Sequence, residues 1–249
     1  MDFNVLNHEL LRDDYTIEEA TALQDKWRVH KEKMELTESH FVEITDINLI
    51  AGVDISFPKE LEPKWGIACA VLWDYEKKEM TAHEFIKGSL HFPYKAGYLG
   101  FRENRLIAES ILNLPQKPDL IMCDGHGLIH PRCFGEAVHL GLALDIPSFG
   151  VAKNPFIGRS SWKDLDRKKG ERTFVLAENE SELEEAGDNV LGEAICLTDN
   201  CKPVFLSVGY KITLKVATEI ALNCSTIHRQ PEPILLADNL SQQELSKEK

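Results

Sequence analysis

The order of the apolar segments is the feature that most constrains the fold of this chain. Three strand-like runs follow one another without an intervening helix, namely INLIAGVDISF, WGIACAVLWDY and MTAHEFIKG. Further along, the short apolar strands DLIMCD and IPSFGVA alternate with stretches of helical period at 98–113 and 133–144. A meander followed by alternating helices and strands predicts an α/β fold, with a mixed central β-sheet flanked by helices.

Further elements are expected on both sides of this region. Residues 16–39 are predicted to form a helix, with Thr16 as its N-cap and Glu19 completing a capping box. Later strands are expected at RTFVLA, VLGEAICL and PVFLSVGY, followed by a helix at LKVATEIALNC and a last helix near 233–240. We expect a single domain over residues 1–249, with a core of about 16–240 and mobile polar ends.

Composition narrows the class of protein. The chain has 28 Lys and Arg residues against 41 Asp and Glu residues, a formal charge of −13. This charge excludes a protein that coats nucleic acid with its whole surface, but it allows a small site where cations supply the positive charge. The sequence has no signal-like start, no apolar run of membrane-spanning length and no CxxC pair. We therefore expect buried free thiols, no membrane association, and a cytoplasmic location that in a eukaryote extends to the nucleus.

Four acidic residues interrupt apolar patterns. Asp54 lies within an apolar strand, and Asp124 ends another strand just before a glycine-rich turn. Glu103 and Asp238 lie beside apolar neighbours at helical spacing. Each acid alone has an ordinary structural explanation, as a turn cap or as the partner of an arginine. If the four converge, their mutual repulsion requires cations, and oxygen ligands of this kind suit Mg²⁺ or Mn²⁺, which serve phosphoryl transfer.

Other kinds of site have weaker support. The sequence contains no GxSxG, GxxxxGK[ST] or GxGxxG motif. His126, His130 and Cys133 offer three zinc donors, but they lie on one short loop without a partner CxxC pair. A turn that needs glycine torsions beside Asp124 is a simpler explanation of that loop.

Six segments together resemble the endonuclease V family: AGVDISF, PYKAGYLGFRE, DGHGLIHPRCFGEAVHLG, IPSFGVAK, KPVFLSVGYKITL and PEPILLAD. They occur in the family's order with compatible spacings and extend from about Gly52 to Leu240. The resemblance implies an RNase H-like fold in which carboxylates meet at the edge of the sheet. It also implies an endonuclease that uses Mg²⁺, with Mn²⁺ able to substitute. Such an enzyme cuts the second phosphodiester bond 3′ to a hypoxanthine nucleotide and leaves 3′-hydroxyl and 5′-phosphate ends.

The resemblance assigns catalytic roles residue by residue. The four acids match metal ligands of the family, with Asp54 and Asp124 as the principal ligands, Glu103 as the third acid and Asp238 at a late position occupied by Asp or His. Lys153 resembles the lysine near the scissile phosphate, where an ammonium group offsets transition-state charge. His130 matches a family histidine near the same site, although a loop histidine bonded to backbone explains it equally well.

The resemblance also implies a wedge and a lesion pocket. Tyr94 matches the tyrosine of a wedge that separates the strands around the lesion, although a tyrosine packed on the following helix is an alternative. In this chain PYKA replaces the frequent PY-x-P, so Ala96 leaves the rigidity of the wedge open. The pocket residues are expected to be Gly97, Leu99, Gly125, Gly127 and Gly135, of which the glycines allow backbone amides to approach a flipped purine closely.

Two other functions stay open on the sequence alone. A resolvase or exonuclease with an RNase H-like fold could use the same acids, and a catalytically silent reader of inosine-containing RNA could use the same pocket. The expected partner is single-stranded RNA or DNA that contains inosine or deoxyinosine, bound by a monomer. Because the chain is acidic, we expect a small phosphate-binding footprint built from Lys153 and the 159–172 segment.

Overall fold

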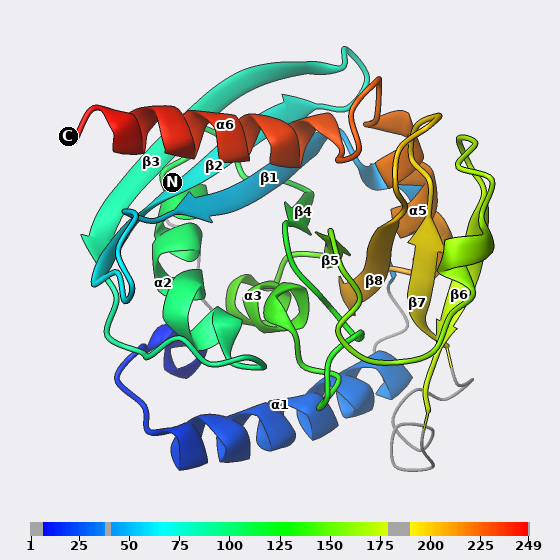
Figure 1. The fold of residues 1–249 in the computed structure, drawn as a ribbon. Coiled ribbons are helices and arrows are strands. Elements are labelled where there is room, and N and C mark those ends of the chain that lie inside the picture. Colours follow the sequence, from blue (N-terminus) through cyan, green and yellow to red (C-terminus); the bar gives the residue numbers. More distant parts are fainter. Residues whose placement is uncertain (1–6, 38–40, 179–189, 249) are drawn as a thin grey trace.

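The central feature of the computed structural model is a mixed β-sheet, which confirms the predicted fold class (Figure 1). The structure describes residues 7–37, 41–178 and 190–248. Their eight strands lie in the order β3-β2-β1-β4-β5-β8-β7-β6. The strands β1, β4 and β5 run parallel, and the other neighbouring pairs are antiparallel. Their bounds are β1 (Leu49–Ser56), β2 (Trp65–Asp74), β3 (Glu79–Ser89), β4 (Leu120–Cys123), β5 (Ser148–Ala152), β6 (Arg172–Leu176), β7 (Val190–Ile195) and β8 (Val204–Tyr210).

Helices cover both faces of the sheet. On one face lie α2 (Leu99–Leu112) and α3 (Glu136–Leu144), with α1 (Ile17–Thr37) packed outside them. On the other face lie α5 (Leu214–Asn223) and α6 (Glu232–Ser246). Three short 3-10 helices are η1 (His8–Leu11), η2 (Ile44–Asp46) and η3 (Trp162–Asp164). Every strand and helix predicted from the sequence has a counterpart among these elements.

The two ends of the chain contribute more structure than expected. The predicted capping box begins α1, because Thr16 Oγ1 accepts from the Glu19 N–H at 3.2 Å and Glu19 Oε2 accepts from the Thr16 N–H at 2.8 Å. That helix ends at Thr37, and the remainder of the predicted 16–39 range lies outside the described residues. Leu10 of η1 is fully buried, and α6 continues to Ser246. Ordered structure therefore extends beyond the expected core of 16–240 at both ends, while 1–6 and 249 lie outside the described residues.

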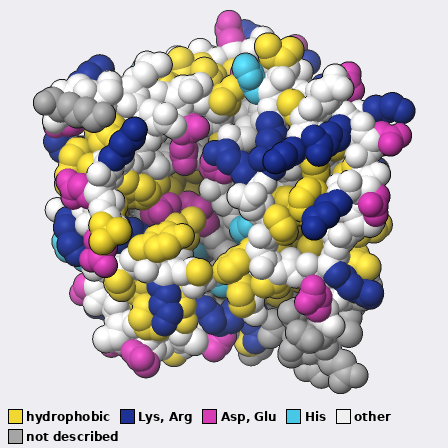
Figure 2. All heavy atoms as spheres, viewed as in Figure 1, with side chains coloured by type: hydrophobic (Ala, Val, Ile, Leu, Met, Phe, Trp, Pro, Cys, Tyr) yellow, Lys and Arg dark blue, Asp and Glu magenta, His cyan; other side chains and the backbone are white. Residues whose placement is uncertain are grey.

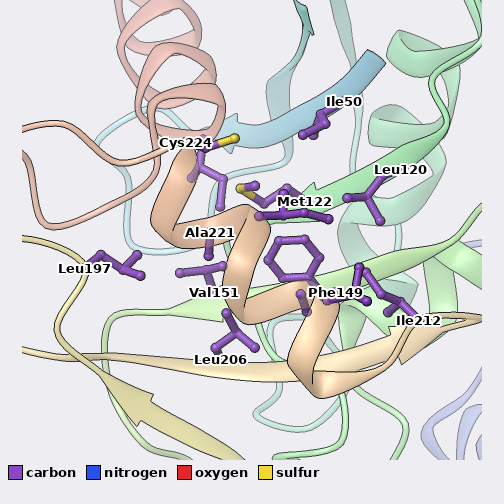
Figure 3. Close-up of a cluster of buried hydrophobic side chains, with 14 of the residues drawn as sticks. Ile50, Leu120, Met122, Phe149, Val151, Leu197, Leu206, Ile212, Ala221 and Cys224 are labelled. Carbon is purple, nitrogen blue, oxygen red and sulfur yellow. The ribbon is translucent and has the colours of Figure 1, made fainter. Parts of the chain in front are cut away.

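Successive side chains of β1 point to opposite faces of the sheet and contribute to two apolar cores, one on each face. Ile50 packs with the sheet and α5 in the core drawn in Figure 3, together with Phe149. Ala51 and Val53 point to the opposite face, toward α2 and α3. Since every second residue faces the same way, Asp54 lies on the face that α6 covers.

Two predictions about class can be compared with the described residues. Cys69, Cys123, Cys196 and Cys224 are buried free thiols, as predicted. None of the helices in the described ranges has the length and hydropathy that crossing a membrane requires.

The first turn of α6 lies directly on β1 at Gly52. A Cβ added to Gly52 would lie closer than 3.0 Å to the carbonyl group of Pro233, which is backbone and cannot rotate away. Farther along the same contact, Ser56 Oγ and Ser241 Oγ lie 2.8 Å apart. The absence of a side chain at Gly52 therefore sets how closely α6 approaches the strand that carries Asp54.

We expect Gly52→Ala to lower the free energy of unfolding by about 2–3 kcal/mol, because overpacking against fixed backbone costs on the order of 1–3 kcal/mol. Urea denaturation would measure the loss. Gly88→Ala on β3 is the matched control, because its new methyl group would meet the end of the Leu106 side chain, which can rotate away. An equal loss in the two variants would contradict the proposed packing.

Candidate active site

Three parallel strands bring sequence-distant residues to one edge of the sheet. In the register of β1 and β4, Val53 lies beside Cys123. Asp54 is the next residue of β1, Asp124 directly follows β4, and Lys153 directly follows β5. Because the carboxyl ends of adjacent parallel strands meet at the same edge, these three side chains lie together.

The α6 helix adds a third carboxylate to this edge. Burial, followed by the charges of Asp124 and Asp238 and a hydrogen bond with Asp238, raises the pKa of Asp54 to about 9. Asp238 also accepts a hydrogen bond from the side-chain amide of Gln242, one turn later on α6. Three of the four acids singled out from the sequence therefore act on one another directly.

Glu103 joins this group from the α2 side of the sheet. It is buried, and burial followed by the charges of Glu136, Asp54 and Asp124 raises its pKa well above the usual value. The neighbouring Arg102 opposes this rise only in part, because its guanidinium donates to the carbonyl oxygens of Phe92 and Pro63 at 2.6 and 2.7 Å. The structure thus brings all four predicted acids into one electrostatic group.

Lys153 is the cation that contacts this group most directly. Its Nζ donates to Asp124 Oδ2 at 2.8 Å, and 42% of its side chain is exposed. Burial alone would lower the pKa of Lys153, but the hydrogen bond to Asp124 and the nearby carboxylates outweigh it and raise the pKa. Figure 2 shows acidic side chains gathered in a hollow near the middle of this face, with a band of Lys and Arg side chains beside it.

The donor set suits a hard divalent cation, although it is not drawn together into a ligand cage. Across residues 7–37, 41–178 and 190–248, no three His, Cys, Asp or Glu side chains are placed to hold one ion. This finding also covers the zinc trio His126, His130 and Cys133. Neighbouring carboxylates nevertheless help to raise the pKa of Asp54 and of Glu103, so the site has an excess of negative charge that a cation would neutralise, and oxygen donors favour Mg²⁺ or Mn²⁺.

His130 is bonded to backbone through both ring nitrogens. Nδ1 accepts from the N–H groups of Arg132 and Phe134 at 3.2 and 3.4 Å. Nε2 therefore carries the proton and donates to the carbonyl of Gly97 at 3.0 Å, and burial lowers the pKa of the ring to about 3. This geometry matches the alternative of a loop histidine bonded to backbone, rather than a group that exchanges protons at the phosphate.

A cavity of about 240 Å³ opens next to the acidic group. Four of the five predicted pocket residues line it, namely Gly97, Leu99, Gly125 and Gly135. Gly127 does not: a Cβ there would overlap the carbonyl of Val208, and its N–H donates to Ser207 Oγ at 2.8 Å. Close packing on β8 therefore explains this glycine, whereas the prediction placed it at the ligand.

Tyr94 lies at the mouth of the cavity with 76% of its surface exposed. Tyr98, rather than Tyr94, packs on the start of α2, with its ring stacked 6.1 Å from that of Phe92. The loop between the two tyrosines is fixed at the carbonyl of Gly97. That oxygen accepts from Gln24 Nε2 of α1 at 2.9 Å and from Arg132 Nη2 at 3.5 Å, in addition to His130.

Two residues that line the cavity, Phe156 and Glu136, are not predicted from the sequence. Phe156 follows β5, and its ring lies 5.9 Å from that of His126 and 5.6 Å from that of His130. Glu136 is the first residue of α3, where an acid is commonly explained by the positive end of the helix dipole. Neither residue breaks a periodic pattern, so the sequence offers no signal that distinguishes it.

Comparisons with known proteins agree with this geometry. Residues 29–239 match the family model described as Endonuclease V. The endonuclease V of Dictyoglomus thermophilum is 36% identical over 201 residues, which cover 81% of this chain and 82% of the relative.

Solved structures extend the likeness to three dimensions. The endonuclease V of Streptomyces avermitilis superposes with a TM-score of 0.77 at 32% identity, covering 93% of this chain and 94% of the other. That of Ciona intestinalis, a complex with a 23mer DNA containing an inosine followed by a ribo-adenosine, has a TM-score of 0.77 at 26% identity, covering 94% and 100%. These structures confirm the RNase H-like fold. The chain belongs to the endonuclease V family and is a nuclease that hydrolyses phosphodiester bonds.

Proposed function

We propose that this nuclease is a divalent-metal-dependent endonuclease that cuts strands carrying a hypoxanthine nucleotide. The observation that supports this most strongly is a cavity of about 240 Å³ that the exposed Tyr94 lines, together with Gly125, the residue that directly follows Asp124. Sites for drug-sized ligands occupy about 300–1,000 Å³, so this volume suits a single flipped base. The complex of the Ciona relative with inosine-containing DNA supports the same substrate class.

The proposed catalytic residues divide into cation ligands and a phosphate contact. Asp54, Asp124, Asp238 and Glu103 would hold the divalent cation, for which Mg²⁺ is proposed and Mn²⁺ can substitute. When bound, the cation supplies positive charge that stabilises the attacking and leaving oxygens of the displacement. Lys153 is exposed enough to donate from Nζ to a non-bridging phosphate oxygen, where charge develops in the transition state.

The lesion pocket determines which bond is cut. A base held in the cavity fixes the register of its strand, so the separation of cavity and acids selects one phosphodiester bond. We propose that this bond is the second one 3′ to the hypoxanthine nucleotide, with 3′-hydroxyl and 5′-phosphate ends as products. In this proposal His130 is a positioning residue, because it fixes Gly97 of the pocket to the loop that follows Asp124.

The proposed substrate is a single strand of RNA or DNA bound through a small phosphate footprint. Lys153 and the 159–172 segment are proposed to form it. Two lysines of that segment already have partners, since Lys169 Nζ donates to the carbonyl of Ser225 at 3.1 Å and Lys168 lies 3.6 Å from Asp166. The remaining cations are few, as the chain's formal charge of −13 leads one to expect.

We expect cleavage of matched oligonucleotides that contain one inosine or deoxyinosine when Mg²⁺ is present, and none when it is chelated. Comparing single-stranded RNA, single-stranded DNA and duplex DNA on sequencing gels would identify the preferred strand and the bond cut. The 5′-labelled product should end one nucleotide 3′ to the lesion. Equal cutting of lesion-free controls would instead indicate another RNase H-like nuclease, and lesion binding without any cutting would indicate a non-catalytic reader.

We expect Asp54→Asn to abolish cleavage while making the metal-free protein more stable above neutral pH. An aspartate with a folded pKa of about 9 and an unfolded pKa of about 3.9 binds more protons when folded, so stability is fully present below pH 4 and is lost as pH rises toward 9. The substitution should flatten this decline. Thermal denaturation in chelator and in Mg²⁺, at several pH values, would measure it.

The same experiment separates a metal ligand from a merely buried acid. Mg²⁺ should stabilise the unsubstituted protein, and the gain should disappear in Asp54→Asn. Glu193→Gln is the control, because Glu193 is a buried carboxylate bonded to Thr218 of α5, away from the acidic group. If Mg²⁺ stabilised the Asp54 variant as much as the unsubstituted protein, Asp54 would not be a ligand.

We expect Tyr94→Ala to weaken binding of a lesion-containing strand by about tenfold, because stacking of one base on an aromatic ring contributes on the order of 1–3 kcal/mol. Tyr94→Phe should retain the affinity, since the ring remains. Fluorescence anisotropy with chelated metal would measure binding without cleavage. Because the side chain is exposed, the melting temperature should not change; a large drop would mean that Tyr94 serves the fold instead.

A further inference from the structure

The cavity is lined by a buried carboxyl group that is not among the four proposed cation ligands. Glu136 is 5% exposed and lines the cavity together with Gly125, Gly135 and Phe156. Its Oε2 is fully buried and has no hydrogen-bond partner among the described residues. A buried carboxyl oxygen without a partner is costly, so its presence in a ligand cavity suggests that a bound ligand provides the missing bond.

The position of this oxygen depends on a glycine. A Cβ added to Gly125 would lie closer than 3.0 Å to Glu136 Oε2, so any side chain at position 125 would displace the carboxyl group. The backbone of Glu136 is also fixed, because its carbonyl accepts from Asn104 Nδ2 of α2 at 3.4 Å. The carboxyl group is thus held at the wall of the cavity between the turn after Asp124 and the start of α3.

The nearby charges do not supply a cation for this group. Burial and then the charge of Asp124 raise the pKa of Glu136 to about 8, and Glu136 in turn raises the pKa of Glu103. A ligand that donates a hydrogen bond to Oε2 would therefore supply the missing partner without adding negative charge. A carboxylate only accepts hydrogen bonds, so the group of the ligand that it recognises is a donor.

We propose that Glu136 is a specificity-determining residue and that its carboxylate accepts a hydrogen bond from N1–H of the flipped base. Hypoxanthine presents a donor at N1, where adenine presents an acceptor, so a carboxylate oxygen at this position would distinguish the two bases. Phe156 lies on the same cavity and offers an aromatic ring for the base to stack on. This inference rests on the proposed function and adds to it the residue that reads the base.

A competing explanation makes Glu136 a support for Glu103 in the acidic group. The two explanations differ in what a substitution changes. Support for the acidic group would affect all substrates by the same factor, whereas recognition of the base edge would affect only bases that present N1–H and O6. A substrate analogue without that edge therefore distinguishes them.

The experiment compares strands containing inosine with strands containing nebularine, the purine nucleoside that lacks both N1–H and O6. The measured quantity is the ratio of kcat/KM for the two strands, together with their Kd values in chelator. For the unsubstituted protein we expect inosine to be favoured by about tenfold or more. Glu136→Leu, which has a similar volume and no polar side-chain atoms, should reduce this preference by about tenfold. The change should come mainly from a lower kcat/KM for the inosine strand.

Glu136→Gln tests the chemistry with a side chain of the same shape. Its amide oxygen can accept from N1–H and its NH₂ group can donate to O6, so the preference for inosine should be retained. Glu193→Gln, which alters a buried carboxylate on β7, controls for general effects of losing a buried charge and should leave the ratio unchanged.

The outcomes separate this inference from the proposed function. Glu136 does not read the base if Glu136→Leu and Glu136→Gln lower kcat/KM for both strands by the same factor. The same conclusion follows if the preference for inosine survives in the folded Leu variant. If the unsubstituted protein fails to cut either strand in Mg²⁺, the proposed function itself is wrong. Circular dichroism and melting temperature would confirm that each variant is folded before the ratios are compared.

Discussion

Repulsion among the half-buried Asp54, Asp124 and Asp238 and the buried Glu103 is the interaction on which the rest of this structure depends. The parallel pairing of β1 with β4 places Asp54 next to Asp124, and α6 brings Asp238 against them because Gly52 lets the helix lie on the strand. This arrangement opposes folding, since burial and the charges of Asp124 and Asp238 disfavour the ionised form of Asp54. It is sustained by two apolar cores, one on each face of the sheet, which hold the strands and helices in place. The fold therefore keeps a high density of negative charge where a cation would be stabilised.

The fold and much of the site could be predicted because they produce periodic patterns. Strands and helices appear as repeats of apolar residues, and an acid such as Asp54 or Glu103 is visible because it interrupts a repeat. Glu136 could not be identified in this way, because an acid in the first turn of a helix is common and needs no special explanation. For His130 and Gly127 the sequence suggests a functional role, but tertiary contacts explain the residues. Their positions in the sequence suggest a ligand, but their hydrogen bonds and packing are known only from tertiary contacts with Gly97 and β8.

The sheet edge separates chemistry from recognition. Residues proposed to act on the phosphate come from β1, α2, α6 and the segments after β4 and β5, whereas the cavity is lined by Gln24 of α1, the start of α2, the start of α3 and the loops beside them. Helix α2 therefore contributes to both halves, and two further contacts join them. The turn after Asp124 supplies Gly125 to the cavity wall, and His130 bonds the carbonyl of Gly97. Movement of the cavity relative to the acids is therefore restricted by a short backbone connection and by a side-chain hydrogen bond to backbone.

The anchoring of Gly97 also bears on the loop that carries Tyr94. A second proline after the tyrosine would stiffen this loop covalently, but the chain has Ala96 there. Three side chains instead converge on a single carbonyl oxygen, one of them Gln24 from α1. Stiffness obtained from such bonds is reversible and is shared with a helix on the outside of the molecule. Because Gln24 also lines the cavity, α1 contributes both to the cavity wall and to the position of the loop that carries Tyr94.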